Sequence, residues 1–218
     1  MGKHKKWIVA ANVYLRIDYM EKEIYFDENG TLAENNSFLL RTPQTDDKDG
    51  YIRLCIEIAI APGIYDDREF REVCWKNQLK SEHLEVSIID KSKNEYVGNL
   101  LLKRWNTDTP EIGIDLLTKY RSKGIGYQTI KMLMVRTMKV IPVKYFVMRA
   151  YSTNVHSQNL IKKLGGVVFK YEESEYQILM NALNDVMGNA FVQQLKDKYD
   201  MKDSSSEEDK IICYKIGV

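Results

Sequence analysis

The stretch Arg121-Ser122-Lys123-Gly124-Ile125-Gly126 decides how this chain is expected to fold, because it joins a strand pattern to a helix pattern. Before it, Glu111-Ile112-Gly113-Ile114-Asp115-Leu116-Leu117 alternates polar or small residues with apolar ones in its first half, as a half-buried strand does. After it, five residues recur at the spacing of one helix face: Ile130, Leu133, Met134, Thr137 and Met138. The sequence therefore predicts a strand, a glycine turn and a helix.

A glycine turn between a strand and a helix is typical of an anion site. Backbone N–H groups of the turn and the positive end of the helix dipole point toward one place. Gly124 and Gly126 would let the backbone approach a diphosphate, and Arg121 and Lys123 supply positive charge. A plain turn before a helix fits the same residues. A dinucleotide fingerprint is excluded by Thr129, and no G-x-x-x-x-G-K-[ST] loop occurs.

The composition fits one domain with additions and argues against several classes of partner. The chain has 218 residues, with 32 basic residues (Lys and Arg) against 31 acidic ones and a formal net charge of +1. We therefore expect neither nucleic acid nor a membrane as its partner. The cysteines form no C-x-x-C pair: Cys55, Cys74 and Cys213. They indicate reduced thiols of a cytoplasmic protein rather than disulfides or a metal site.

The N-terminus is not expected to be a secretory signal or a membrane anchor. Basic residues precede an apolar run at positions 7–11, but Asn12, Arg16 and Asp18 interrupt the pattern and no cleavage site follows. No apolar stretch reaches the length of a membrane span. These observations also favour a cytoplasmic protein.

The order of the predicted elements is mixed α/β. Residues 1–36 read as an N-terminal extension with a possible hairpin, in which strands at 14–19 and 22–26 precede a turn at 27–30. In residues 37–218 we expect strands at 37–41, 84–89, 96–103, 111–117, 144–150, 167–171 and 211–216. Helices are expected at 45–59, 66–79, after the glycine turn and at 157–164, and one long helix is expected as an insertion at 175–199, with a dent at Gly188.

A second motif makes the glycine turn more specific. About 28 residues after Gly126, the sequence reads Asn154-x-x-Ser157-x-x-Leu160, followed by Lys163-Leu164-Gly165. The two motifs at this spacing resemble the GNAT superfamily of acyl-CoA-dependent N-acetyltransferases, and most closely its branch of ribosomal-protein alanine N-acetyltransferases. The resemblance covers roughly residues 37–172 and the last strand, and leaves out the first 36 residues and the long helix.

This resemblance implies a central, largely antiparallel sheet whose fourth and fifth core strands, here 111–117 and 144–150, splay apart to admit the pantetheine arm of acetyl-CoA. It places the diphosphate on the N–H groups of residues 123–126, with Arg121, Ser122 and Tyr127 beside them. It assigns a hydrogen bond to the cofactor arm to Asn154 and a contact with the adenosine phosphate to Lys163, for which a solvated lysine is the alternative. No metal is implied.

The resemblance also implies where the chemistry occurs. The N–H of Leu116 would stabilise the oxyanion. Two proton-handling positions of many family members are occupied by Ile161 and Met148, which cannot transfer protons. The candidate acid is then Ser157, unless its hydroxyl caps its own helix. The candidate base is Glu111, unless it is a solvated carboxylate. Asp115 has the same parity on the strand and would attract a cationic acceptor.

These features predict an N-acetyltransferase that transfers an acetyl group directly to a primary amine of a small molecule or a protein N-terminus. An α-amine has a pKa of about 8, against about 10.4 for lysine. A site with few proton-transferring side chains therefore favours an amine of low pKa. The alternative is an acyl-CoA-binding regulatory protein without turnover. A monomer or a homodimer is expected, and the long helix would cover the acceptor side, form a dimer face or pack on the sheet.

Overall fold

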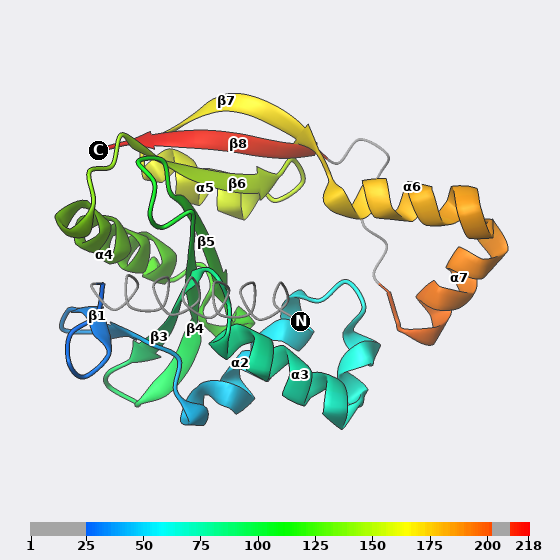
Figure 1. Ribbon diagram of the computed structural model, residues 1–218, viewed down its shortest axis with the longest axis horizontal. Helices are drawn as coiled ribbons and strands as arrows, with labels where there is room; N and C mark the ends of the chain where they lie inside the picture. The colour runs from blue at the N-terminus through cyan, green and yellow to red at the C-terminus, as the bar shows by residue number, and fades with distance from the viewer. Residues whose placement is uncertain (1–24, 202–209) are drawn as a thin grey trace, which may run out of the picture.

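The computed structural model describes residues 25–201 and 210–218, which form an eight-stranded sheet with helices on both faces (Figure 1). The strands lie in the order β1-β2-β3-β4-β5-β6-β8-β7, and every pairing except β5 with β6 is antiparallel. Their bounds are β1 Thr31–Glu34, β2 Phe38–Arg41, β3 Leu84–Asp90, β4 Glu95–Lys103, β5 Glu111–Leu116, β6 Tyr145–Tyr151, β7 Gly166–Glu173 and β8 Lys210–Gly217. The predicted mixed α/β fold is confirmed.

Two pairs of helices cover opposite faces of the sheet. On one face lie α2 Lys48–Ile58 and α3 Arg68–Leu79, preceded by the short turns η1 Thr45–Asp47 and η2 Pro62–Asp66. On the other lie α4 Ile125–Val140, which follows η3 Thr118–Tyr120, and α5 Val155–Lys163. Successive side chains of β5 point to opposite faces of the sheet. Ile114 and Leu116 point toward Gly126 of α4, and Asp115 points toward the α2 side.

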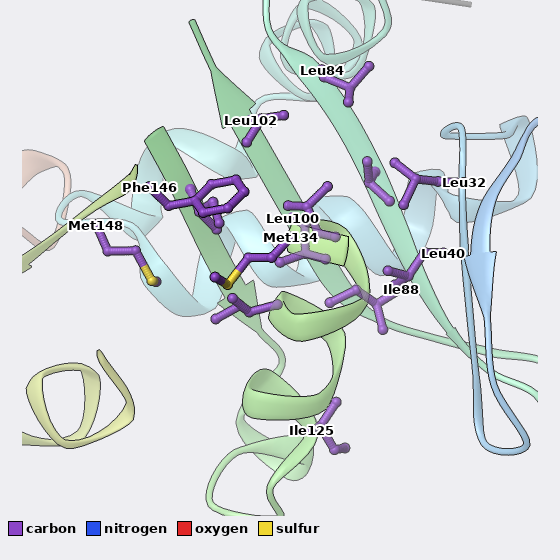
Figure 2. Close-up of a cluster of buried hydrophobic side chains, with 14 of the residues drawn as sticks. Leu32, Leu40, Leu84, Ile88, Leu100, Leu102, Ile125, Met134, Phe146 and Met148 are labelled. Carbon is purple, nitrogen blue, oxygen red and sulfur yellow. The ribbon is translucent and has the colours of Figure 1, made fainter. Parts of the chain in front are cut away.

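The main hydrophobic core lies under α4. Figure 2 shows Met134 of this helix beside Leu100 of β4, with Leu102 of β4 and Phe146 and Met148 of β6 in the same cluster. All five residues are buried. Four residues of the periodic face predicted after the glycine turn are buried and anchor α4, namely Ile130, Leu133, Met134 and Thr137, whereas the fifth, Met138, is 41% exposed.

The sheet opens between β5 and β6. Six residue pairs join β4 to β5, but β5 and β6 pair only at Glu111 and Val147, where the Val147 N–H donates to Pro110 O over 2.9 Å. In Figure 1, β6, β7 and β8 run across the top of the molecule at a steep angle to β3, β4 and β5. Both strands run in the same direction, so the opening widens toward Leu116 and Tyr151, as predicted.

The predicted helix at 175–199 is two helices. Its parts, α6 Glu175–Met187 and α7 Asn189–Lys198, meet at Gly188, whose φ of +80° a right-handed helix cannot contain. Figure 1 shows this α6–α7 arm extending beyond the ends of β7 and β8. Its far end returns to the body of the protein, where the Gly63 N–H of η2 donates to Tyr199 O over 3.2 Å.

The N-terminal prediction lies mostly outside the described residues. Strand 14–19 and residues 22–24 are not described, and residues 25–26 lie in a turn rather than in a strand. The turn at 27–30 is present, closed by hydrogen bonds from the N–H groups of Asn29 and Thr31 to Asp27 Oδ1. It leads into β1, which pairs with β2 although it falls within the predicted extension. Within the described ranges, no helix is long and apolar enough to cross a membrane.

Candidate functional site

The glycine turn lies at the open end of the β5–β6 gap. Ser122 and Gly124 have φ of 59° and 75°, and Gly124 is the residue that precedes the first turn of α4. A Cβ at Gly124 would meet nothing within 4 Å, so the backbone here is open to an approaching group. Gly126 also has a packing role that was not expected, because a Cβ there would lie 3.1 Å from Leu160 and 3.4 Å from Ile114. Gly126 therefore allows α4 to pack closely on β5 and α5.

The first turn of α4 presents N–H groups without helical partners. The first hydrogen bond of the helix runs from the Gln128 N–H to Gly124 O over 3.3 Å. The N–H groups of Ile125, Gly126 and Tyr127 precede it and have no acceptor inside the helix. With the helix dipole, they form a cradle that favours an anion.

Basic side chains lie near Tyr127, the last residue of this cradle, and near Leu116. Lys163 of α5 lies 4.8 Å from the centre of the Tyr127 ring, and Lys131 of α4 lies 5.6 Å from it. Arg121 donates from Nε to Leu116 O over 2.8 Å. Sequence reasoning named Arg121, Tyr127 and Lys163 but missed Lys131, although its position four residues after Tyr127 on a helix was a usable signal.

Leu116 directs its own N–H into the gap. The neighbouring Leu117 N–H donates toward β4, to Val97 O over 3.0 Å. Successive N–H groups of a strand point to opposite edges, so the Leu116 N–H faces β6, and no β6 residue pairs with it. This geometry provides a backbone donor beside the glycine turn.

Asn154 begins α5 on the other side of the gap. Its Oδ1 accepts a hydrogen bond from the Ser157 N–H over 3.0 Å, so Asn154 caps the helix. Ser157 is the third residue of α5 and not its cap, which rules out the capping role considered for its hydroxyl. The helix starts at Val155, two residues earlier than predicted, because Asn154 supplies this cap.

Asp115 lies on the α2 face next to Leu116. The residue is exposed, yet the surrounding protein atoms raise the pKa of its carboxyl above the ordinary value, while Arg121 acts in the opposite direction. Asn99 stands directly opposite it on β4. Asn99 Oδ1 and Tyr96 Oη are buried and have no hydrogen-bond partner among the described residues. Sequence reasoning missed both, because nothing in the local pattern of β4 marks them.

Glu111 lies at the closed end of the gap, inside a group of cations. Its Oε1 accepts from Arg149 Nε over 2.9 Å and lies 3.6 Å from Lys103 Nζ. Its Oε2 lies 3.7 Å from Arg104 Nη2. The side chain is 14% exposed, so these contacts occupy most of the carboxylate. Glu111 and Asp115 are therefore on one face, as predicted from parity, but at opposite ends of β5.

Ile161 and Met148 are part of the core. Ile161 is 1% exposed and Met148 is 3% exposed, and both lie in the cluster beneath α4 and α5. The site therefore combines an N–H cradle for an anion, a backbone donor in the gap and a carboxylate on the opposite face. The open position at Gly124 and the partnerless N–H groups of α4 fit a diphosphate, which is the group that a bound acyl-CoA would present there.

Comparisons with known proteins agree with this geometry. The family model described as the acetyltransferase (GNAT) domain matches residues 37–167. An acetyltransferase of the GNAT family from Bacillus anthracis superposes with a TM-score of 0.60 at 14% identity, over 84% of this chain and 96% of that one. Spermidine N-acetyltransferase from Vibrio cholerae, solved with CoA and spermine, superposes with a TM-score of 0.58 at 12% identity, over 84% and 96%.

A search of curated protein sequences gave no significant match. The family model, however, covers more than half of the chain, including β2 to β6 and the glycine turn. The chain belongs to the GNAT acetyltransferase family.

Proposed function

We propose that this protein transfers an acetyl group directly from acetyl-CoA to a primary amine. The observation that carries the proposal is the meeting of three features at the open end of β5. These are the N–H cradle in the first turn of α4, the Leu116 N–H that faces the gap, and the Asp115 carboxylate on the other face. Each corresponds to one need of the reaction: holding the donor, stabilising the oxyanion and receiving a proton.

The donor is held mainly by backbone groups. The diphosphate of acetyl-CoA would lie on the N–H groups of residues 123–126, with Arg121, Ser122 and Tyr127 around it. Lys163 lies beside the Tyr127 ring, and we assign to it the contact with the adenosine phosphate that the resemblance implies. Asn154 uses Oδ1 to cap α5, which leaves its amide nitrogen to donate to the pantetheine arm.

In the chemical step, the neutral amine nitrogen attacks the thioester carbonyl carbon. The Leu116 N–H donates to the oxygen as its negative charge develops. When the intermediate collapses, the C–S bond breaks, the amide forms and CoA leaves as a thiolate. The proton lost by the amine goes to the Asp115 carboxylate, directly or through water. We assign this role to Asp115 rather than to Glu111, because cations engage both Glu111 oxygens.

Only one candidate acid is proposed for protonating the leaving thiolate. Ser157 is the candidate acid, and its half-buried side chain lies one turn into α5. Because a free thiol has a pKa of about 8.5, the CoA thiolate can leave with little assistance from an acid. An acceptor of low pKa, such as an α-amine, suits such a site. The resemblance to the ribosomal-protein alanine branch points to the same class of amine, at a protein N-terminus or on a small molecule.

A second candidate function is an acyl-CoA-binding protein without turnover. The burial of Met148 and Ile161 supports it, because two positions that carry proton-transferring side chains in many relatives are part of the core here.

The two candidates are separated by a pair of measurements. Thermal stability should rise with acetyl-CoA for both. Thiol release from acetyl-CoA should depend on added amine only for an enzyme, and an amine panel would include an N-terminal alanine peptide, spermidine, an amino sugar and lysine. Stabilisation without release for any amine would favour the binding protein. If acetyl-CoA produced no stabilisation and no thiol were released with any amine, both candidate functions would be contradicted.

A further inference from the structure

A cleft outside the acyl-CoA site is lined by residues of α2 and α3. Its volume is about 430 Å³, within the range of about 300–1,000 Å³ that small-molecule pockets occupy. Figure 1 shows the two helices side by side below the sheet. The lining residues are Lys48, Asp49, Ile52, Arg53, Ile56, Glu57, Arg68, Arg71 and Glu72.

Two of the three carboxylates that line this cleft already have partners. Glu72 accepts from Lys48 Nζ over 2.5 Å, and this bond lowers the pKa of Glu72. Glu57 turns its Oε2 to the Thr118 N–H over 2.6 Å, at the start of η3. Asp49 is the one lining carboxylate for which no hydrogen bond or ion pair occurs within the described residues.

The arginines of the cleft are largely uncommitted. Arg53 and Arg68 are exposed, and neither forms an ion pair within 4 Å in the described parts of the chain, although the charge of Arg68 contributes to the lowered pKa of Glu72. Arg71 donates from Nε to Tyr65 O, which leaves its two terminal nitrogens. Three guanidinium groups therefore face one uncommitted carboxylate, and guanidinium groups bind carboxylate and phosphate through paired donors.

Apolar side chains lie between these charges. Ile52 is 7% exposed, Ile56 is half-buried, and both line the cleft. A ligand that fills the space would meet guanidinium groups at its charged end and isoleucine along its body. This combination favours an organic anion over an inorganic one, because apolar contact adds to the charge interaction.

We propose that the α2–α3 cleft binds a small organic anion, a carboxylate or phosphate monoester that carries an apolar group. This binding is separate from acyl transfer, since the cleft shares no residue with the N–H cradle or the β5–β6 gap. Glu57 of the cleft accepts a hydrogen bond from the Thr118 N–H, two residues after Leu116, and the proposal is that the cleft and the acyl-CoA site are occupied at the same time.

The test is calorimetric titration of the full chain with phenyl phosphate in saturating CoA, which fills the cradle before the probe is added. We expect saturable binding that weakens at least tenfold when Arg53→Gln and Arg68→Gln are combined. Lys80→Gln with Lys139→Gln removes the same two charges from exposed positions outside the cleft, and should change the affinity less than twofold. Inorganic phosphate should bind more weakly than phenyl phosphate.

Absence of binding, or equal weakening in the two double variants, would overturn the proposal. Equal weakening would mean that the probe responds to overall charge. Because the readout is binding in the presence of CoA, it does not depend on acyl transfer, and a failure here would leave the proposed function untouched.

Discussion

The two faces of the sheet beside the β5–β6 opening are built in different ways. On the α4 face and in the gap, the features that would hold the donor are backbone groups: the N–H groups of α4, the open position at Gly124 and the Leu116 N–H. On the α2 face, the features nearest the gap are side chains from separate elements, namely Asp115, Asn99 and Tyr96. Hydrogen-bond donors of the backbone are kept when most side chains around them are replaced, whereas a site made of side chains loses a group with each substitution.

The largest effect should come from the side-chain face. Asp115→Asn is expected to lower kcat/KM for the amine about 100-fold, which is the low end of the rate loss that removal of a proton acceptor causes. The Kd for CoA should stay unchanged within twofold. Glu111→Gln should reduce stability more than activity, since it leaves three cations without their shared partner. Steady-state kinetics on both variants would show which carboxylate accepts the proton. A larger loss of kcat/KM in Glu111→Gln than in Asp115→Asn would mean that Glu111, not Asp115, has this role.

On the α4 face, reversing one charge should weaken the donor. Arg121→Glu is expected to raise the Kd for CoA about 30-fold, because a charge-assisted hydrogen bond contributes about 2 kcal/mol. Lys139→Glu makes the same change in the last turn of α4 and should leave the Kd within twofold. Calorimetric titration would measure both. Equal losses would mean that net charge, not the cradle, attracts CoA.

A matched pair of glycines tests whether open backbone matters. Gly124 and Gly165 have φ of 75° and 88°, and a Cβ at either would meet nothing within 4 Å. Alanine at each should therefore cost a similar amount, about 1 kcal/mol of unfolding free energy. Only Gly124→Ala should weaken CoA binding several-fold. Thermal unfolding and a CoA titration would check this, and an unaltered CoA affinity in Gly124→Ala would contradict the cradle.

The hydroxyl of Tyr96 offers a smaller test on the α2 face. It is buried without a partner in the described structure, and such a group costs free energy. Tyr96→Phe keeps the ring and should raise the free energy of unfolding by about 1 kcal/mol in chemical denaturation. A loss of stability would show that the hydroxyl has a partner in solution.

The smallest effect concerns pH. The pKa of Asp115 is raised in the folded protein, so ionisation costs more there than in the unfolded chain, and this cost is present above the folded pKa. Asp115→Asn should therefore raise Tm at pH 7 and have no such effect at a pH well below 3.8, where the carboxyl is protonated in both states. A Tm gain of equal size at both pH values would contradict this.

The same contrast explains what could be predicted from the sequence. The strand, glycine turn and helix at residues 111–140 follow from local spacing, so β5, α4 and the cradle were predictable. The opening beside β5 was known only through the family resemblance, since periodicity gives no pairing. Lys131 carried a local signal, but Asn99 and Tyr96 come together with Asp115 only when β4 pairs with β5.

Two errors have physical causes of the same kind. The helix at 175–199 divides at Gly188, where only a dent was predicted, because Gly188 has a positive φ that a right-handed helix does not contain. The role given to Gly126 was incomplete, because its contacts with Leu160 and Ile114 come from α5 and β5. Local patterns predicted the elements, and the contacts between distant elements determined what individual residues do.

The central claim is that backbone N–H groups at the start of α4 hold the donor. Hydrogen–deuterium exchange of the full chain, with and without saturating CoA, tests it most directly. We predict slower exchange for the amides of residues 123–127 and of Leu116, with no change at Gly165. Binding of CoA without protection of residues 123–127 would contradict the account.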